Sequence, residues 1–395
     1  MYDFSTWHRR VGIGAEKWDA IERAGITDPD VIPFSVADME WETAPEIQQE
    51  LAEKALYGCY GYTVANEDYQ RAVQRWMRVR HNWDIDLDWM VQSYGVVPAI
   101  GAAIQAFTRP GDGILIQPPV YPPFRNVPAS LGREVVANPL RLTGGRYEMD
   151  FDGLEAKAAR PNVKMLVLCS PHNPVGRVWT RPELERVAEI CLRHGVLVFS
   201  DEIHFDFVHA GHSHTVYASL SEACRDNCII GTAASKTFSL AGLSTSNIII
   251  PNPKLRKAYA SMQLTTSGFF NNYFGLAATK TAYELGESWL EAMLAEVAGN
   301  FEYVRSCLRE KFPSVWVSDL EGTYLMWADF RSFGLAPREL DEFFSKEALL
   351  FLNAGDMFGP GGEGFQRINL ACPRRCLETA MDRLDQAAAR RGLPR

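Results

Sequence analysis

The sequence predicts an α/β fold in which helices cover both faces of a mostly parallel sheet and a smaller α+β unit is attached. Two observations predict it: several short runs are apolar throughout, and the segments between them carry apolar residues at helical spacing, as Pro182–His194 does. The runs that indicate buried strands are Ile114–Ile116, Val163–Cys169, Val196–Ser200, Cys228–Thr232 and Asn247–Ile250. Ligands of such sheets bind beyond the carboxyl ends of the strands, so we expect the chemistry in the loops that follow these runs.

The smaller unit begins with a long amphipathic helix, which we expect from Glu287 to Lys311. Beyond it, Ser314–Arg331 and Phe365–Ala371 are expected to form strands, and Ala387–Arg395 has the composition of a tail. The first 45 residues are expected to pack on this unit. We therefore divide the chain into an N-terminal segment that joins the small domain, a large domain and a small C-terminal domain, at residues 1–45, 46–285 and 286–395.

Charge and length exclude several classes of partner. The chain has 395 residues, and 40 Lys and Arg against 49 Asp and Glu give a net charge of −9. An acidic protein has no overall field that attracts nucleic acid or an anionic membrane. No run reaches the roughly 18 apolar residues of a membrane span, and Met1–Arg10 lacks the apolar core of a signal peptide. We therefore expect a cytoplasmic protein that binds neither nucleic acid nor membrane.

The eight cysteines do not form a disulfide framework in a chain of this length. They include no C-x-x-C, and the closest pairs, Cys224 with Cys228 and Cys372 with Cys376, are each four residues apart. Two thiols alone make a poor zinc site. Since free cysteine is often buried, we expect structural free thiols.

Unusual residues follow three of the predicted strands. Asn173 stands in the turn Ser170–Arg177, which two prolines and a glycine make rigid. Asp201 follows the next strand, and Lys236 comes shortly after Thr232. A lysine directly beyond an apolar strand is costly to bury unless it is paired or used covalently. Each feature alone has an ordinary structural explanation, but at successive strand ends they indicate a single site.

This set of residues suits an aldehyde cofactor. A lysine can form a Schiff base with pyridoxal phosphate (PLP), and an aspartate that faces the pyridine nitrogen keeps that nitrogen protonated. The phosphate needs a helix N-terminus, which Tyr94–Ala99 supplies after the predicted strand Trp89–Ser93. Backbone N–H groups near Val96 and Val97 would face the phosphate, and Tyr121 could cover the ring.

The motifs that carry these residues are Y-G-V-V-P-A, P-P-V-Y-P-P-F, S-P-H-N-P-V-G-R, S-D-E-I-H and S-K-T-F-S-L-A-G-L, in this order. In this combination the chain resembles the fold-type-I PLP enzymes of the class I/II aminotransferase superfamily, and within it the cystathionine β-lyase-type C–S lyases. The resemblance covers about residues 32–373. It implies an α/β fold with a mostly parallel central sheet and a smaller α+β domain, a homodimer and a small amino-acid substrate.

The resemblance also implies which residues bind the cofactor. Lys236 would be the Schiff-base lysine, Asp201 the partner of the pyridine nitrogen, and Asn173 the donor to the ring hydroxyl. Tyr121 would stack on the ring. Separately from the resemblance, our hypothesis for the mechanism is that Tyr121 or Tyr62 protonates a departing sulfur atom. The remaining cofactor contacts would come from Val96, Val97, His204, Ser235 and Tyr62, the last reaching the phosphate of the neighbouring subunit.

The substrate contacts implied by the resemblance come from three places in the chain. Arg367, in F-Q-R-I-N-L-A-C-P, would clamp the α-carboxylate of the substrate as a bidentate pair. The backbone at Ala37 would approach the same carboxylate, and Asn173 would contribute beside the cofactor ring. We find no second arginine placed by a motif for a dicarboxylic substrate.

Two departures from the transaminase pattern favour a lyase. Transaminases of the superfamily usually carry tyrosine three residues after the aspartate and arginine eight residues after the lysine, where this chain has His204 and Ser244. We therefore expect α,β-elimination of L-cystathionine or a related cysteine S-conjugate to a thiol, pyruvate and ammonia. The alternative is amino transfer to a 2-oxo acid, and a more remote one is a non-catalytic regulatory protein of the same fold. The motifs do not identify the physiological sulfur substrate.

A metal site is the competing interpretation. His204, His209, His212 and His214 lie within eleven positions of one another, beside three carboxylates. Such a cluster could ligate zinc or iron. It lacks the H-E-x-x-H spacing and leaves Lys236 unexplained, so we expect no metal and place the last three histidines on a surface loop.

Overall fold

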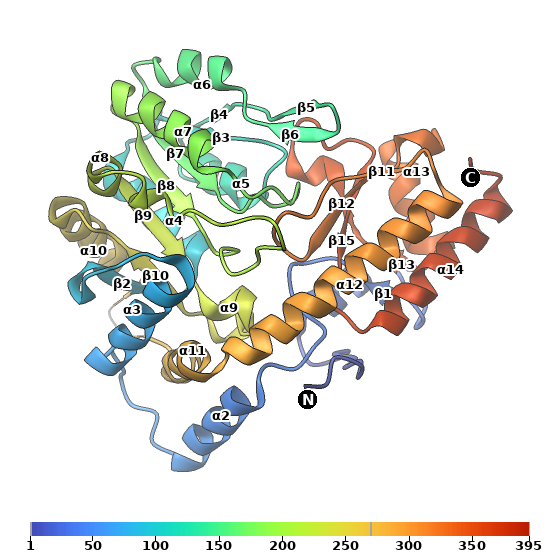
Figure 1. Cartoon of the computed structure of the whole chain (residues 1–395), viewed down its shortest axis with the longest axis horizontal. Helices are drawn as coiled ribbons and strands as arrows, with labels where there is room; N and C mark the ends of the chain where they lie inside the picture. Colours follow the sequence, from blue (N-terminus) through green and yellow to red (C-terminus); the bar gives the residue numbers. More distant parts are fainter. Residues whose placement is uncertain (1, 269–270, 395) are drawn as a thin grey trace.

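The large sheet has seven strands, and the order of these strands determines where the ligand-binding edge lies. The computed structural model describes residues 2–268 and 271–394, which are arranged as in Figure 1. The strands follow the order β2 (Met90–Ser93), β10 (Ser246–Ile249), β9 (Cys228–Thr232), β8 (Leu197–Asp201), β7 (Val163–Cys169), β3 (Gly113–Ile116) and β4 (Glu134–Ala137). The six strands predicted in this part of the chain are confirmed, with ends within one residue.

One strand of this sheet runs against the others. β10 pairs antiparallel with both β9 and β2, whereas the neighbours from β9 to β4 are parallel. A mostly parallel sheet is therefore confirmed, but a parallel β10 is wrong, because apolar periodicity does not encode strand direction. The reversal brings the first residue of β10, Ser246, to the edge where β8 and β9 end, since Asn247 is paired with Thr232.

Helices cover both faces of this sheet, as the sequence predicts. Successive residues of β7 alternate between the faces: Met165 and Val167 pack in one apolar cluster, and Leu166 and Leu168 in the other. The Met165 face is covered by α4 (Val96–Phe107), α5 (Pro123–Ser130) and α10 (Pro253–Ser267). In the large part of the chain, the helices with buried residues in the Leu166 cluster are α2 (Pro45–Tyr57), α3 (Glu67–His81), α6 (Phe151–Ala158), α7 (Arg181–His194), α8 (Glu222–Asp226), α9 (Ala234–Thr237) and α11 (Tyr273–Leu285).

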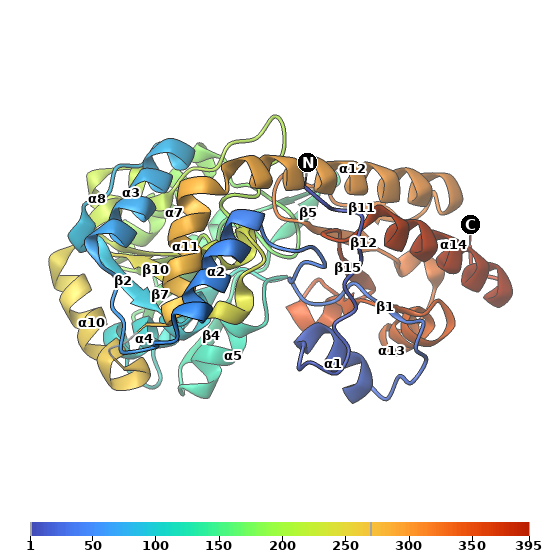
Figure 2. The same cartoon turned by 90° about the horizontal axis from the view of Figure 1, so that it is seen from below.

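The smaller part of the chain has an antiparallel sheet of its own. Its order is β11 (Trp316–Val317), β12 (Leu325–Asp329), β15 (Phe365–Asn369) and β14 (Asn353–Ala354). The helices of this part are α12 (Glu287–Lys311), α13 (Pro337–Glu342) and α14 (Arg374–Arg391). Figure 2 shows α12 running from the large sheet toward the small one, with α14 beside it. The predicted bounds of α12 are confirmed.

The N-terminal segment packs on this smaller sheet. It contains α1 (Glu16–Arg23) and β1 (Ile32–Pro33), and β1 pairs in parallel with β13 (Leu350–Phe351). The side-chain amide of Asn369 donates to the backbone carbonyls of Val36 and Asp38, both at 2.8 Å. These contacts support the division at residues 45 and 285, which we retain as a proposal.

Within Ser314–Arg331 the expected strands are present, but the expected C-terminal tail is wrong. The stretch Ser314–Arg331 holds two short strands with a loop at residues 318–324 between them. The alanine-rich stretch after residue 387 continues α14 to Arg391, and Ala387 and Ala388 are buried. Alanine has the highest helix propensity, so this composition extends the helix until Gly392 ends it in the left-handed conformation. The remaining strands, β5 (Arg141–Thr143) and β6 (Arg146–Glu148), form a hairpin.

The cysteines carry free thiols, as predicted. Six are buried, Cys307 is partly buried and Cys59 is exposed. Burial raises the pKa of several of these thiols, among them Cys169 and Cys191, so they keep their protons and act as small apolar side chains. In the described part of the chain, no helix is both long and apolar enough to cross a membrane.

The packing of β7 generates a stability prediction. Leu166 has no exposed surface, so Leu166→Ala should lower the free energy of unfolding by about 2–5 kcal/mol because it leaves a cavity. The matched control is Lys164→Ala, an exposed position on the same strand, which should change it by less than about 0.5 kcal/mol. Urea denaturation followed by circular dichroism measures both variants. Equal effects would contradict the described packing of β7.

Candidate active site

A cavity of about 390 Å³ opens where the carboxyl edge of the large sheet meets the smaller sheet and the N-terminal segment. The sheet register explains why distant motifs meet here, since Asp201 at the end of β8 is paired with Cys169 at the end of β7 and with Gly231 of β9. Every predicted site residue except Tyr62 lines this cavity: Ala37, Val96, Val97, Tyr121, Asn173, Asp201, His204, Ser235, Lys236 and Arg367.

Lys236 places its amino group at the centre of this arrangement. It stands on α9, directly after the buried strand β9, and its Nζ donates to the backbone carbonyl of Ala37 at 2.7 Å. Burial lowers the pKa of Lys236, the positive charge of Arg367 lowers it further, and the nearby carboxylates of Asp38 and Asp201 act in the opposite direction. The amine is therefore easier to deprotonate than an exposed lysine.

Asp201 faces the same cavity from the end of β8 and is 5% exposed. Its Oδ1 accepts from the backbone N–H of Ile203 at 3.1 Å. Burial raises the pKa of Asp201 to about 7, with Glu202 adding to the rise and Lys236 opposing it. A cation held beside this carboxyl group would lower that pKa and keep the group ionised.

His204 and Tyr324 form a buried polar wall behind these two groups. Their rings meet edge to face with centroids 6.0 Å apart. Burial, followed by the charges of Lys236 and Arg367, lowers the pKa of His204 to about 3, so the imidazole is neutral at physiological pH. The Nδ1 atom of His204 and the hydroxyl of Tyr324 are both buried without a hydrogen-bond partner in the described structure. Both atoms are available to a ligand or to water.

The N-terminus of α4 forms another wall of the cavity. Gly95 precedes the helix, and no side chain caps its first turn, so the N–H groups of Val96 and Val97 lack partners within the helix. Hydroxyl groups gather around this helix end, because Ser235 and the residues that lead into β10 line the same cavity: Ser244, Thr245 and Ser246. Unpaired N–H groups and hydroxyls together suit an anion such as a phosphate.

Arg367 brings a second anion site from the smaller sheet. Its guanidinium is 3% exposed, donates from Nη1 to Asn173 Oδ1 at 2.9 Å and from Nη2 to Asn353 Oδ1 at 2.6 Å, and lies 4.9 Å from the centroid of the Phe358 ring. Its Nε is buried without a partner among the described residues, and burial lowers its pKa to about 10. A buried guanidinium held by neutral amides is a receptor for a carboxylate.

Four predicted site residues have contacts that differ from their expected roles or do not test those roles. The carbonyl of Ala37 accepts from Lys236, and the amide oxygen of Asn173 accepts from Arg367. The hydroxyl of Tyr121 lines the cavity, and burial raises its pKa. Tyr62 is 87% exposed and does not line the cavity of its own chain, so its role stays a prediction.

Sequence reasoning missed Asn353 and Tyr324. Asn353 lies in β14, and besides binding Arg367 its Oδ1 accepts from the backbone N–H of Val36 at 2.9 Å. Neither residue stands in a recognisable motif. Asn353 lines the cavity and Tyr324 contacts the ring of His204, and both come from the smaller part of the chain, which packs on the large sheet. The serines and threonine before β10 follow the lysine motif directly, and that proximity was the available signal for them.

The histidines of the competing metal interpretation have separate partners, and the expected surface position is wrong for two of them. His214 is buried and its Nε2 lies 2.8 Å from Glu202 Oε2, while the Nε2 of the partly buried His209 lies 2.8 Å from the Thr323 carbonyl. His212 alone among the three is exposed. The surface path of the loop does not determine where an imidazole points, and buried carboxylates such as Glu202 attract it inward. Within the described ranges, no group of three His, Cys, Asp or Glu side chains is arranged to hold a metal ion.

Known proteins share the sequence family and the fold of this chain. Residues 29–384 match the sequence model of the family aminotransferase class I and II. The chain is 39% identical to the cystathionine beta-lyase PatB of Bacillus subtilis (strain 168), over 98% of this chain and 99% of that protein. It superposes on cystalysin from Treponema denticola, which contains a pyridoxal 5'-phosphate cofactor, with a TM-score of 0.97, 38% identity and 99% of each chain covered.

A second solved structure agrees with this comparison. The PLP-bound C–S lyase from Staphylococcus hominis superposes with a TM-score of 0.91 at 30% identity, covering 98% of each chain. The fold type and the superfamily predicted from the motifs are thereby confirmed. The chain therefore belongs to the aminotransferase class I and II family and shares the fold of its PLP-dependent C–S lyases.

Proposed function

We propose that the protein is a PLP-dependent carbon–sulfur β-lyase that converts L-cystathionine or a related cysteine S-conjugate into a thiol, pyruvate and ammonia. The observation that carries the proposal is one cavity in which the amine of Lys236 faces the carboxyl group of Asp201 and the guanidinium of Arg367. The names of the similar enzymes, a cystathionine beta-lyase and a C–S lyase, support the reaction type.

The residues of the cavity fit PLP. Lys236 would bind the aldehyde carbon covalently. Asp201 would keep the pyridine nitrogen protonated, and this positive charge would compensate the buried carboxyl group of Asp201. The uncapped N–H groups of Val96 and Val97, with Ser235, would hold the phosphate. The unpartnered Nδ1 of His204 is a polar atom available toward the ring. Tyr121 would stack on the ring, and the amide of Asn173 would bind its hydroxyl.

Substrate binding follows from Arg367. Its guanidinium would take the α-carboxylate as a bidentate pair, while its hydrogen bonds to Asn173 and Asn353 keep its plane fixed. Ala37, whose carbonyl accepts from Lys236, lines the same cavity. A carboxylate held in this way orients the Cα–H bond toward Lys236 and so lowers the entropic part of the barrier.

The proposed proton transfers use the lowered pKa of Lys236 and the raised pKa of Tyr121. When bound, PLP supplies an electron sink for the charge left on the substrate Cα. The amino group of the substrate would displace Lys236 from the aldehyde carbon, and the freed Lys236 would then remove the α-proton as general base. The lowered pKa of Lys236 favours the neutral amine that a base must be. The electron pair left on Cα would then form a Cα–Cβ double bond while the Cβ–S bond breaks with its electron pair on sulfur. Water would hydrolyse the released enamine to pyruvate and ammonia. Burial raises the pKa of Tyr121, so its hydroxyl keeps a proton that it can give to that sulfur.

The choice of elimination over amino transfer is supported by His204 and Ser244. Both line the cavity at the positions where transaminases of the superfamily usually carry tyrosine and arginine. A serine leaves more room and less positive charge beside the phosphate site than an arginine does. Amino transfer remains the alternative outcome of the activity test below.

A homodimer completes the proposed site. The segment from the end of α2 toward α3 exposes large apolar side chains, namely Leu56, Tyr57, Tyr60, Tyr62 and Val64, and Tyr62 is 87% exposed. Contiguous exposed apolar surface marks an interaction face, and a second copy of the chain is the proposed partner. In that dimer, Tyr62 would donate to the phosphate in the neighbouring subunit. The free thiols support a reducing compartment, and we propose the cytoplasm.

The reaction can be tested with purified protein and L-cystathionine. We expect release of pyruvate without any added 2-oxo acid, and loss of that release in Lys236→Ala, because the base and the covalent anchor are both removed. A lactate dehydrogenase-coupled assay measures pyruvate, and the visible absorbance of the cofactor reports its attachment. Transfer of the amino group to an added 2-oxo acid without pyruvate would show instead that the protein is an aminotransferase.

The buried carboxyl group of Asp201 predicts a pH dependence in the cofactor-free protein. Its pKa of about 7 lies above the value of about 3.9 in an unfolded chain, so between these values the folded state keeps a proton that the unfolded state loses. This contribution to stability is complete below about pH 4 and is lost as the pH rises through about 7. Asp201→Asn cannot ionise and should lack this loss, so the stability of the variant relative to wild type should rise by about 2 kcal/mol between pH 5 and 7.

Urea denaturation of the two apoproteins at pH 5, 6 and 7 measures this difference. Glu222→Gln is the matched control, because that side chain is 83% exposed and should leave the pH profile unchanged. Parallel profiles of Asp201→Asn and wild type would show that the carboxyl group of Asp201 is ionised at a normal pKa in the apoprotein.

The dimer proposal predicts complementation between a chain without Lys236 and a chain that is deficient at limiting PLP. Tyr62→Phe should weaken PLP binding about tenfold, because a hydrogen bond to a charged group is lost. Co-expressed with Lys236→Ala, the Tyr62→Phe chain keeps its lysine and receives an intact Tyr62 from its partner, so activity at limiting PLP should recover to about a quarter of the wild-type level. Pyruvate release measures the recovery. No recovery in mixed dimers would place Tyr62 outside the neighbouring site.

A further inference from the structure

Asn173 and Arg367, which touch each other in the cavity, come from different sheets. Asn173 stands in the loop after β7, and Arg367 lies on β15 of the smaller sheet. Their bond, Arg367 Nη1 to Asn173 Oδ1, is 2.9 Å long. The separation of the two sheets therefore decides whether a substrate carboxylate meets a pre-aligned guanidinium and amide.

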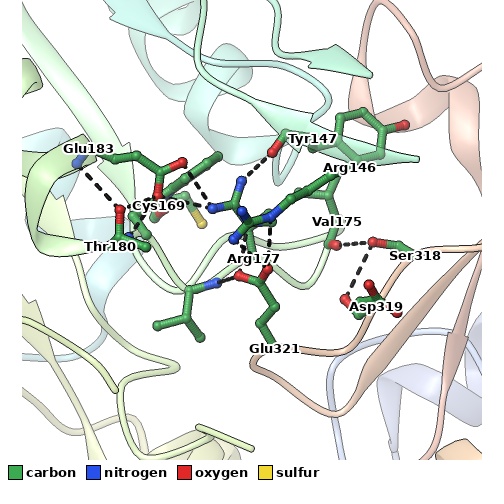
Figure 3. Close-up of polar contacts among 12 residues, drawn as sticks. Arg146, Tyr147, Cys169, Val175, Arg177, Thr180, Glu183, Ser318, Asp319 and Glu321 are labelled. Atoms are coloured by element: carbon green, nitrogen blue, oxygen red, sulfur yellow. Dashed lines mark hydrogen bonds and ion pairs between the residues drawn. The ribbon is translucent and has the colours of Figure 1, made fainter. Parts of the chain in front are cut away.

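A buried polar cluster ties the two sheets together on the far side of the same loop (Figure 3). Its centre is Arg177, which ends the Asn173 loop and is 2% exposed. All three guanidinium nitrogens donate: Nε to Glu321 Oε2 at 2.8 Å, Nη2 to both carboxylate oxygens of Glu183 at 2.9 and 3.0 Å, and Nη1 to the carbonyl of Tyr147. The guanidinium also lies 4.6 Å from the centroid of the Trp179 ring.

Glu321 is the member of this cluster that comes from the smaller part of the chain. It lies in the loop between β11 and β12 and is 4% exposed. Its Oε2 accepts from Arg177 and from the backbone N–H of Val178 at 3.0 Å, and its Oε1 accepts from Arg146 Nη2 at 2.9 Å. Burial raises the pKa of Glu321, but the bonds from Arg177, Val178 and Arg146 outweigh it, so the pKa is lowered and the group is ionised.

The backbones on either side of Glu321 approach as closely as glycine allows. The Gly322 N–H donates to the Gly176 carbonyl at 2.8 Å, and the Ser318 hydroxyl donates to the Val175 carbonyl at 2.6 Å. A Cβ on Gly322 would lie 2.7 Å from Val178 Cγ2 and 2.8 Å from the Phe207 carbonyl. The loop that carries Asn173 is thus fastened along its length to the segment that leads into β12, and β12 pairs with the strand of Arg367.

We propose that Glu321 is a positioning residue: through Arg177 and Val178 it holds the Asn173 loop at the distance from the smaller sheet at which Asn173 and Arg367 receive the substrate carboxylate together. Glu321 does not line the cavity, so it acts through these residues and not by contact with the substrate. The inference rests on the proposed function only for the identity of the substrate, because any amino acid presents the same carboxylate.

The test compares Glu321→Gln with Glu185→Gln in the PLP-loaded enzyme. Glutamine preserves shape but removes the charge and one acceptor, while Arg177 keeps the carboxylate of Glu183, so the variant is expected to fold. Glu185 is the matched control, because it pairs with Arg181 on the neighbouring α7 and both side chains are 48% exposed. Arg146→Met is the second variant, since it removes a charge partner of Glu321 but leaves the bond to Arg177.

Two measurements separate positioning from simple stability. Titration of the cofactor absorbance with L-alanine gives a Kd for carboxylate binding that needs no C–S cleavage, and pyruvate release gives kcat and KM. For Glu321→Gln we expect Kd and KM to rise about tenfold with kcat within about threefold, because binding common to ground and transition states is lost. Arg146→Met should raise Kd about threefold, and Glu185→Gln should change neither constant.

The remaining outcomes decide the proposal. If Glu321→Gln has a lowered Tm but unchanged Kd and KM, Glu321 has only a structural role and the proposal is overturned. If Glu321→Gln does not fold, the same result in Arg146→Met overturns the proposal. A fall of kcat by about tenfold with unchanged KM would also overturn the proposal, because the lost interaction would then be made only in the transition state. A protein that releases no pyruvate but binds L-alanine more weakly in Glu321→Gln would refute the lyase function and uphold the positioning role.

Discussion

The site depends on one constraint: two separate sheets must approach closely enough for Arg367 and Asn173 to form a hydrogen bond across their boundary. A buried guanidinium that meets only amides is costly unless an anion joins it. The guanidinium of Arg367 is therefore an uncompensated positive charge in the cavity, and it favours the binding of an anion. It has this position only when the two sheets pack at the correct distance. The close backbone contact between Gly322 and Gly176 is part of the same constraint, because a side chain at Gly322 would force the sheets apart.

Burial works on the charged groups of the cavity in a common direction. It raises the pKa of Asp201 and lowers those of Lys236 and Arg367, so each group is shifted toward its neutral form. These residues do not neutralise one another through a salt bridge in the described structure, and the cavity is accordingly complementary to a ligand that brings its own charges. A ring cation, a phosphate and a carboxylate are the three charges that the proposed cofactor and substrate supply.

The direction of β10 shows how topology shapes the site beyond the strand-end rule. In a fully parallel sheet the residues before a strand lie at the opposite edge from the ligand. Because β10 is reversed, Ser246 and the hydroxyl side chains before it reach the edge where Lys236 and Asp201 stand. The smaller sheet then covers that edge, and the N-terminal segment contributes Ala37, whose carbonyl takes the amine of Lys236.

The sequence by itself determined the buried strands of the large sheet and the positions of Asn173, Asp201 and Lys236 at their ends, because apolar periodicity and the residues that interrupt it are local properties. The sequence did not predict the direction of β10 or the inward orientation of the His214 side chain. Only the tertiary structure identified Asn353, Tyr324 and Glu321 as neighbours of the site. Their contacts join segments far apart in the chain, as in the 144 residues between Arg177 and Glu321, and such a contact forms only when whole sheets pack.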